Sequence, residues 1–286
     1  MRPITRLALA MTLCTLAFNA QASNVLIVLS DSDHLDLKDN KVFATGFYLN
    51  ELMQPVKLLL DAGHSVTFAT PTGKAPTLDT SSNDKMYFNN DVSALQEHKA
   101  LMEKLKITSA GESPVISLSR VKQIGYEHFD AVYVPGGHAP MQDLLHSAQL
   151  GELLNNFHEH GKTTALVCHG PIALLSTLPD PSAFTQKLEA GTKTAKSDWA
   201  YAGYKFTVIS NQEEELAKQL LKGGAMKFYP QTALELAGGV FSSNTSPWGP
   251  HVVIDRELVT GQNPGSALDV ARVILERLKL PSQPKS

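Results

Sequence analysis

The feature that most constrains the fold of this chain is a repeated alternation of short apolar runs with amphipathic segments, which begins at residue 24. Such runs are typical of strands that are buried on both faces of a parallel sheet, and the segments between them have the periodicity of helices. This alternation predicts an α/β fold, in which a doubly wound, mostly parallel sheet is flanked by helices. The predicted strands are 24–30, 64–71, 129–137, 163–168 and 204–210.

Helix and turn signals agree with this pattern. The helix predicted after the first strand ends at a glycine stop, Gly63, and a last helix is predicted over 266–280. Before that last helix, residues 251–264 are typical of a β-hairpin that turns at Asp255 and Arg256. The apolar face of the first helix consists of Leu52, Val56, Leu59 and Leu60.

Two polar segments interrupt the alternation. Residues 72–120 are rich in Asp, Asn, Ser and Lys and include a predicted helix over 92–105, and residues 179–202 are also polar. We interpret both segments as insertions in a single domain, 23–280, and as candidate lids over a site at the carboxyl ends of the strands. The tail 281–286 is predicted to be disordered.

The first 22 residues have the pattern of a secretory signal peptide. Arg2 and Arg6 precede an apolar run over 7–18, and Ala20 and Ala22 form an A-x-A cleavage site. The run is shorter than the about 20 residues that a membrane-spanning helix needs. We therefore expect a periplasmic or secreted protein without a membrane partner after cleavage. The alternatives are a core helix and an uncleaved anchor.

Charge and cysteine content narrow the classes of function. The net charge is −3 and no basic run is present, so nucleic acid is not an expected partner. The chain has two cysteines, and cleavage would remove Cys14 and leave Cys168 alone. An intrachain disulfide is then excluded, and a lone thiol in an oxidising compartment is either well buried or used for chemistry.

Cys168 lies where an apolar run meets a His-Gly-Pro turn, in ALVCHGPIALL. A strand that turns there into a helix would expose the thiol at a sharp elbow, with the backbone N–H of His169 as an oxyanion donor. A helix N-terminus lowers a thiol pKa from about 8.5 into the range of roughly 3.5–7.5, so we expect an acidic thiol. The alternative is that Cys168 is a small buried hydrophobe.

Two further segments carry candidate site residues. Gly136 and Gly137 follow an apolar strand and permit close backbone approach, so that Gly137 N–H is a second candidate oxyanion donor beside His138. Alternatively, this is a plain turn with His138 on the surface. Glu51 lies among apolar residues, and Pro55 removes the helical N–H partner of its carbonyl. A carboxyl in such surroundings has a raised pKa and can share a proton with a thiolate; otherwise it is a solvated helix residue.

These residues resemble the PfpI-type superfamily, which has a flavodoxin-like, class I glutamine amidotransferase-like fold. Within it, the chain is most similar to the glutathione-independent glyoxalase (glyoxalase III) branch, whose members are also described as holding chaperones. The resemblance runs in order over 24–280. It is carried by Glu51 in E-x-x-x-P, PGGH at 135–138, ALVCHGP at 165–171, S-N-x-E-E at 210–214, PWG at 247–249 and TGQNPGSA at 260–267.

The resemblance implies a role for each matching residue. Cys168 would be the nucleophile, His169 and Glu51 would transfer protons, and Glu214 would orient His169, although the run Glu213–Glu215 allows a shift of one position. Gly136, Gly137, His138 and His169 would bind the substrate oxygens. Relatives often have glycine where this chain has Ala139, which affects loop shape. A signal peptide also departs from a branch that is usually intracellular.

The implied function is a lyase that converts methylglyoxal, a small 2-oxoaldehyde, to lactate without a cofactor or metal. A cysteine peptidase or amidase would use the same thiol, although a histidine directly after the nucleophile is expected to be poorly placed as its base. A holding chaperone would bind unfolded proteins instead. Dimers are common in the superfamily, so the resemblance is also compatible with a homodimer.

Overall fold

The computed structural model describes residues 22–192 and 198–279. The predicted signal peptide, apart from its last residue, and the predicted tail 281–286 lie outside the described residues. Within the described ranges, no helix combines the length and hydrophobicity that crossing a bilayer requires.

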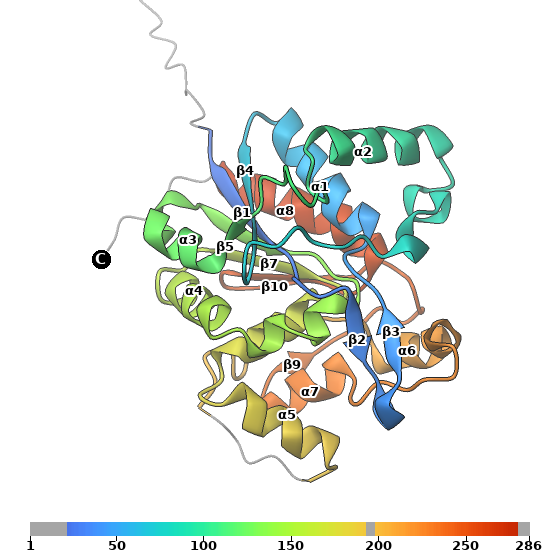
Figure 1. The fold of residues 1–286 in the computed structure, drawn as a ribbon. Helices are drawn as coiled ribbons and strands as arrows, with labels where there is room; N and C mark the ends of the chain where they lie inside the picture. The colour runs from blue at the N-terminus through green and yellow to red at the C-terminus, as the bar shows by residue number, and fades with distance from the viewer. Residues whose placement is uncertain (1–21, 193–197, 280–286) are drawn as a thin grey trace, which may run out of the picture.

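The core of the protein is a seven-stranded sheet (Figure 1). All of its neighbouring strands are parallel except the pair at one edge, β10 and β11, which forms the predicted hairpin. In spatial order the strands are β10 (Val252–Asp255), β11 (Leu258–Gly261), β7 (Thr163–Val167), β6 (Ala131–Val134), β1 (Asn24–Val28), β4 (Ser65–Thr70) and β5 (Ile116–Ser117).

Helices cover both faces of this sheet, which confirms the predicted doubly wound α/β fold. On one face, α1 (Leu49–Asp61) packs against α8 (Ala267–Leu278) and α2 (Val92–Lys104). On the other, α4 (Ala148–Glu159) packs against β7 and α3 (Leu118–Ile124) (Figure 1). This arrangement brings the start of α1 to the carboxyl ends of β6 and β7.

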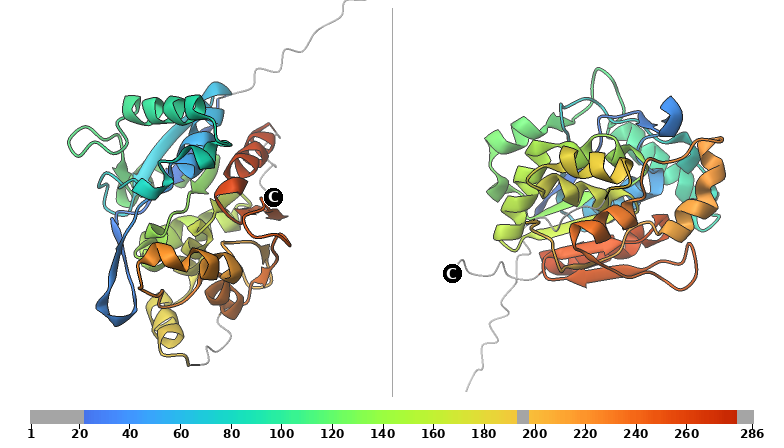
Figure 2. Two further views of the ribbon diagram at one scale, coloured as in Figure 1. Left: turned by 90° about the vertical axis from the view of Figure 1, so that its right-hand side faces the viewer. Right: turned by 90° about the horizontal axis from the view of Figure 1, so that it is seen from below.

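Smaller elements surround the carboxyl ends of the strands. The hairpin β2–β3 projects from the body (Figures 1 and 2). The 3₁₀ helix η7 (Gly170–Thr177) follows β7, and α6 and α7 lie nearby in the last third of the chain. The remaining bounds are β2 (His34–Asp36), β3 (Val42–Ala44), α5 (Pro181–Glu189), β8 (Lys205–Phe206), α6 (Asn211–Ala217), α7 (Pro230–Ala237) and β9 (Val240–Phe241).

The prediction that 204–210 is a strand of the main sheet is wrong. Only β8 forms there, and it pairs with β9 in a separate two-stranded sheet. The place beside β7 is taken by β11, which pairs with Thr164–Val167. The segment after β8 instead crosses the end of β7, where Ile209 N–H donates to the Cys168 carbonyl at 3.1 Å.

The two insertions differ in their relation to the carboxyl ends of the strands. The first reaches the start of α1, since the Oγ of Ser82 accepts a 2.9 Å hydrogen bond from Leu49 N–H. It also contains β5 and the start of α3, which were not predicted. In the second, α5 packs against η7, and Trp199 is buried with its Nε1–H donating to the Leu174 carbonyl at 3.0 Å. Trp199 is therefore part of the core and not of a lid.

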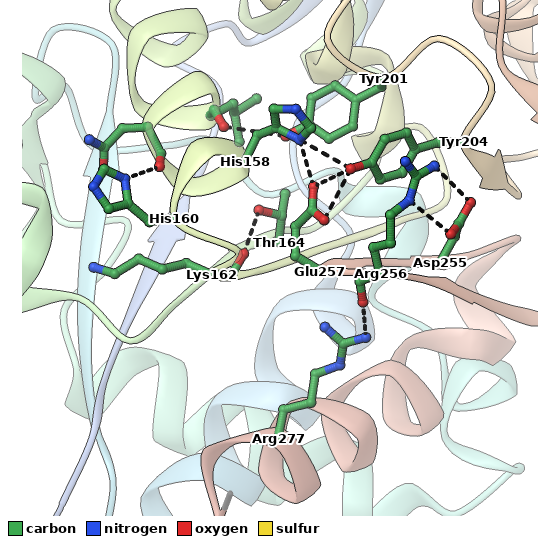
Figure 3. Close-up of polar contacts among 12 residues, drawn as sticks. His158, His160, Lys162, Thr164, Tyr201, Tyr204, Asp255, Arg256, Glu257 and Arg277 are labelled. Atoms are coloured by element: carbon green, nitrogen blue, oxygen red, sulfur yellow. Dashed lines mark hydrogen bonds and ion pairs between the residues drawn. The ribbon is translucent and has the colours of Figure 1, made fainter. Parts of the chain in front are cut away.

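A polar cluster around the buried Glu257 anchors the β10–β11 hairpin at the opposite, amino-terminal end of β7 (Figure 3). The Glu257 carboxylate accepts from Tyr204 O–H at 3.0 and 3.1 Å and contacts Nδ1 of His158 at 2.8 Å. The Arg256 guanidinium lies 3.2 Å from the centre of the Tyr204 ring and pairs with Asp255 at 3.1 Å. The cluster fixes β11 beside β7, the strand that ends at Cys168.

Candidate active site

Cys168 occupies a sharp turn directly after β7. Its φ of +58° is in the left-handed region, which costs a non-glycine residue on the order of 1–3 kcal/mol and is common at functional sites. Two neighbouring segments hold the turn: Cys168 N–H donates to the Gly261 carbonyl at 2.9 Å, and Ile209 N–H donates to the Cys168 carbonyl at 3.1 Å. The sharp turn matches the predicted elbow, but the thiol is buried and not exposed as predicted.

Glu51 lies in the first turn of α1 and is fully buried. Its Oε2 accepts the Gly136 N–H at 2.7 Å. The carbonyl that Pro55 deprives of a helical partner accepts the Tyr133 O–H at 2.6 Å instead. Glu51 is thus held at both its carboxyl and its backbone, and the interpretation as a solvated helix residue is wrong.

Gly136 lies against the side chains of both Cys168 and Glu51. A Cβ atom at this position would lie 2.7 Å from the Cβ of Cys168 and 2.7 Å from Oε2 of Glu51, so only glycine fits. Its N–H is already engaged by Glu51, which makes Gly136 a positioning residue in this structure rather than a free donor for substrate. The next residue, Gly137, has a φ of +87°, and its N–H faces the thiol, where it favours the thiolate.

His169 connects Cys168 to Glu214. Nδ1 of His169 is 3.3 Å from Sγ of Cys168, and its Nε2 is 2.9 Å from Oε1 of Glu214. All three side chains are buried. The expectation that a histidine directly after the nucleophile is poorly placed is wrong, because the left-handed turn at Cys168 brings the ring back over the sulfur.

The three consecutive glutamates have different surroundings. Glu214 alone contacts His169, whereas Glu215 is exposed and pairs with Lys218. The buried Glu213 closes a capping box with Ser210 at the start of α6 and accepts from Trp248 N–H at 2.8 Å. Glu213 therefore fixes the helix that presents Glu214. Sequence reasoning missed this role, although the S-x-x-E spacing of a capping box was available.

His138 is buried, which rules out the surface position that a plain turn would give it. Its ring packs on that of His169, with centroids 4.1 Å apart and a tilt of 39°. Phe43, on β3, contacts its edge at a centroid distance of 5.2 Å. One ligand atom each from His138, His169 and Glu214 lie within 4.8 Å of one another, close enough for a metal ion.

Burial dominates the electrostatics of the site. It raises the pKa of Glu51 to about 8 and that of Glu214 to about 7, and it lowers the pKa of His169 to about 3. It also raises the pKa of the Cys168 thiol, and the nearby Glu51 carboxylate adds to this effect. The expectation of an acidic thiol is therefore not met, because the desolvation of Cys168 outweighs the donors at the turn.

The site is covered by residues from the first insertion and from the β2–β3 hairpin. Tyr48, which precedes α1, packs against Tyr87 with ring centroids 5.5 Å apart. Burial raises the pKa of Tyr87, and negative charge on the nearby Cys168 adds to this effect. Phe43 packs against His138, and Cys168 is only 3% exposed.

Comparison with known proteins points to one family. The sequence model described as ThiJ/PfpI family-like matches residues 43–216. A probable glutathione-independent glyoxalase of Schizosaccharomyces pombe is 27% identical over 272 residues, which cover 91% of this chain and 99% of that protein. The protein/nucleic acid deglycase HchA of Staphylococcus aureus is 28% identical over 154 residues, which cover 53% of this chain and 49% of that protein.

The fold comparison agrees. The crystal structure of glyoxalase III from Candida albicans matches with a TM-score of 0.65 and 22% identity, covering 89% of this chain and 97% of that one. At this level of identity the match supports the fold alone.

Proposed function

Since this chain belongs to the ThiJ/PfpI family, we propose that it is a glutathione-independent glyoxalase that converts methylglyoxal to lactate. The observation that carries the proposal is that Sγ of Cys168 lies between two groups able to move protons. Glu51 lies on one side, across the missing Cβ of Gly136, and Nδ1 of His169 lies on the other at 3.3 Å.

In the proposed reaction, Sγ adds to the aldehyde carbon of methylglyoxal, and the thiol proton passes through Nδ1 of His169 to the carbonyl oxygen. The product is a hemithioacetal. Glu51, as carboxylate, then removes the proton from C1 and returns it to C2 through an enediol, which converts the adduct to a lactoyl thioester. Water hydrolyses the thioester and restores the thiol. The sum is methylglyoxal plus water to lactate, with C1 oxidised and C2 reduced internally, so no outside oxidant is needed.

The backbone and histidine groups would serve the oxygen atoms of the substrate. The N–H of Gly137 faces the thiol and that of His169 directly follows Cys168, and both would stabilise the alkoxide and enediolate. His138 would bind the second carbonyl oxygen of the 2-oxoaldehyde.

Two alternatives place larger substrates at the same thiol. A peptidase needs a polypeptide to reach Sγ, and a deglycase, the activity named for HchA, acts on adducts carried by macromolecules. The 3% exposure of Cys168 favours a small free aldehyde over both. A holding chaperone would need no active thiol.

The experiment that tests the proposal gives purified protein methylglyoxal in the absence of glutathione and measures lactate. We expect lactate to form and general protein substrates to release no peptides. Peptide release without lactate would favour the peptidase. Suppression of protein aggregation that survives Cys168→Ala, together with no lactate from the wild type, would favour the chaperone.

A further inference from the structure

His138 contains a buried atom that the proposed reaction does not fully account for. Its Nδ1 is shielded from solvent and has no hydrogen-bond partner among residues 22–192 and 198–279. Buried polar atoms in native proteins are nearly always paired, so an unpaired imidazole nitrogen inside a site points to something that it binds. Phe43 and His169 hold the ring from two sides.

The His138 ring and the side chains beside it are of the kinds that bind transition metals. His138, His169 and Glu214 are each 4% exposed, and one ligand atom from each lies within 4.8 Å of the other two. Two imidazoles and one carboxylate are a common donor set for Zn²⁺, whose ligands lie about 2.0–2.2 Å from the ion and leave a further position open. Stacked rings do not both aim at one point, so binding requires a rotation of the His138 ring.

We propose that His138, His169 and Glu214 form a binding site for a borderline divalent cation such as Zn²⁺, and that the bound cation inhibits the enzyme. The cation would replace the 2.9 Å contact between Nε2 of His169 and Oε1 of Glu214.

Inhibition follows from the two nitrogens of His169. A metal on Nε2 leaves the single proton of the neutral imidazole on Nδ1. Nδ1 is the atom 3.3 Å from Sγ of Cys168, and with a proton already bound it cannot accept the proton of the thiol. This part of the inference rests on the proposed function, whereas binding itself does not.

Binding is tested by competition between the purified protein and a chromophoric chelator for Zn²⁺. We expect one tight equivalent in the wild type. His138→Phe keeps an aromatic ring against Phe43 but removes both nitrogens, and it should weaken binding at least about tenfold, as should Glu214→Gln. The matched control Glu215→Gln alters the exposed neighbour and should bind like the wild type.

Cys168→Ala separates this site from a simple thiol site. It retains all three proposed ligands and should retain the tight equivalent. Loss of Zn²⁺ binding in Cys168→Ala, or wild-type affinity in both His138→Phe and Glu214→Gln, would overturn the proposal. Thermal unfolding of each variant shows whether it is folded, and the two ligand variants are independent of each other.

The inhibition arm adds Zn²⁺ to the wild type during the lactate assay. We expect activity to fall over the same concentration range in which the tight equivalent fills, and EDTA to restore it. If Zn²⁺ binds at these residues and lactate formation is unaffected, the inhibitory role is wrong. If the protein binds Zn²⁺ but never forms lactate, the proposed function fails while the metal site stands.

Discussion

The N–H of Gly136 donates a 2.7 Å hydrogen bond to Oε2 of Glu51, and this contact ties the carboxyl group beside Cys168. We predict that Gly136→Ala lowers lactate formation at least about 100-fold, because the new Cβ would meet Cys168 and Glu51 at 2.7 Å and separate them. Gly111→Ala is the control, since a Cβ there meets nothing within 4 Å. Equal activity of the two variants would refute the positioning role.

The contact between Glu214 and His169 predicts a graded effect. Glu214→Gln should lower kcat about 10- to 100-fold, as expected for a group that orients another, while His169→Ala should lower it about 10²–10⁴-fold. Glu215→Gln should leave kcat unchanged, because the Glu215 side chain is exposed and pairs with Lys218 instead of His169. Steady-state kinetics of the three variants measures these effects. A larger loss of kcat in Glu215→Gln than in Glu214→Gln would mean that Glu214 does not orient His169.

The Tyr133 hydroxyl donates a hydrogen bond to the Glu51 carbonyl, which has no helical N–H partner because residue 55 is proline. Tyr133→Phe should therefore destabilise the protein by about 1–3 kcal/mol, the usual cost of a buried unpaired carbonyl. Denaturant unfolding measures this difference. Tyr126→Phe is the comparison, since the Tyr126 hydroxyl has no hydrogen bond to any described residue, and it should change stability much less. A similar loss of stability in both variants would mean that the hydrogen bond from Tyr133 to Glu51 does not stabilise the protein.

The raised pKa of Glu51, about 8, predicts how the stability of the protein depends on pH. Between pH 4.5 and 8 the unfolded state loses the Glu51 proton while the folded state keeps it, so the stability that this proton provides falls as the pH rises. Glu51→Gln cannot ionise, and its melting temperature relative to the wild type should therefore be higher at pH 8 than at pH 4.5. A pH-independent difference would show that Glu51 is not protonated in the folded protein.

The surroundings of Cys168 predict how the alkylation rate of its thiol depends on pH. We expect alkylation of Cys168 by iodoacetamide to rise only at a pH above the about 8.5 of a free cysteine, because burial and the Glu51 carboxylate both raise the pKa of the thiol. In Glu51→Gln the carboxylate is absent, so the midpoint should lie below that of the wild type, while burial still raises the thiol pKa. Cys168→Ala gives the background rate. An acidic midpoint in the wild type would restore the interpretation as a low-pKa thiol.

The predicted export of the chain is open to a direct test. We propose cleavage after Ala22, on the basis of the A-x-A site that follows the apolar run. Intact-mass measurement of the protein from a periplasmic or secreted fraction should show a chain that begins at Ser23. A full-length chain with Met1 confined to the cytoplasm would contradict this proposal.

Local patterns were sufficient for much of the fold. The apolar runs at β1, β4, β6 and β7 and the hairpin were predicted because burial on both faces and turn residues are visible in short windows. The run 204–210 has the same composition and is also mostly buried, but it lies outside the main sheet. The strand that lies beside β7 is β11. The two are far apart in the sequence, so their pairing cannot be predicted from a short stretch of residues.

The candidate site shows the same division. Glu51 was singled out by its apolar neighbours and by Pro55, and the structure places it in the interior. The contact of Glu214 with His169 and the stacking of His138 depend on loops that meet only in three dimensions. The thiol pKa was misjudged because a turn motif indicates nearby donors but not how completely tertiary packing removes water.

The most direct test of the account compares lactate formation from methylglyoxal, without glutathione, by the wild type, Cys168→Ala, Glu51→Gln and the double variant. Because both groups act in one pathway, each single variant should lose at least about 10²–10⁴-fold and the double variant should be no slower than the worse single one. EDTA should not inhibit the wild type. Wild-type rates in Cys168→Ala, with thermal unfolding confirming that the variant is folded, would contradict the central claim that this thiol forms the bond to the aldehyde.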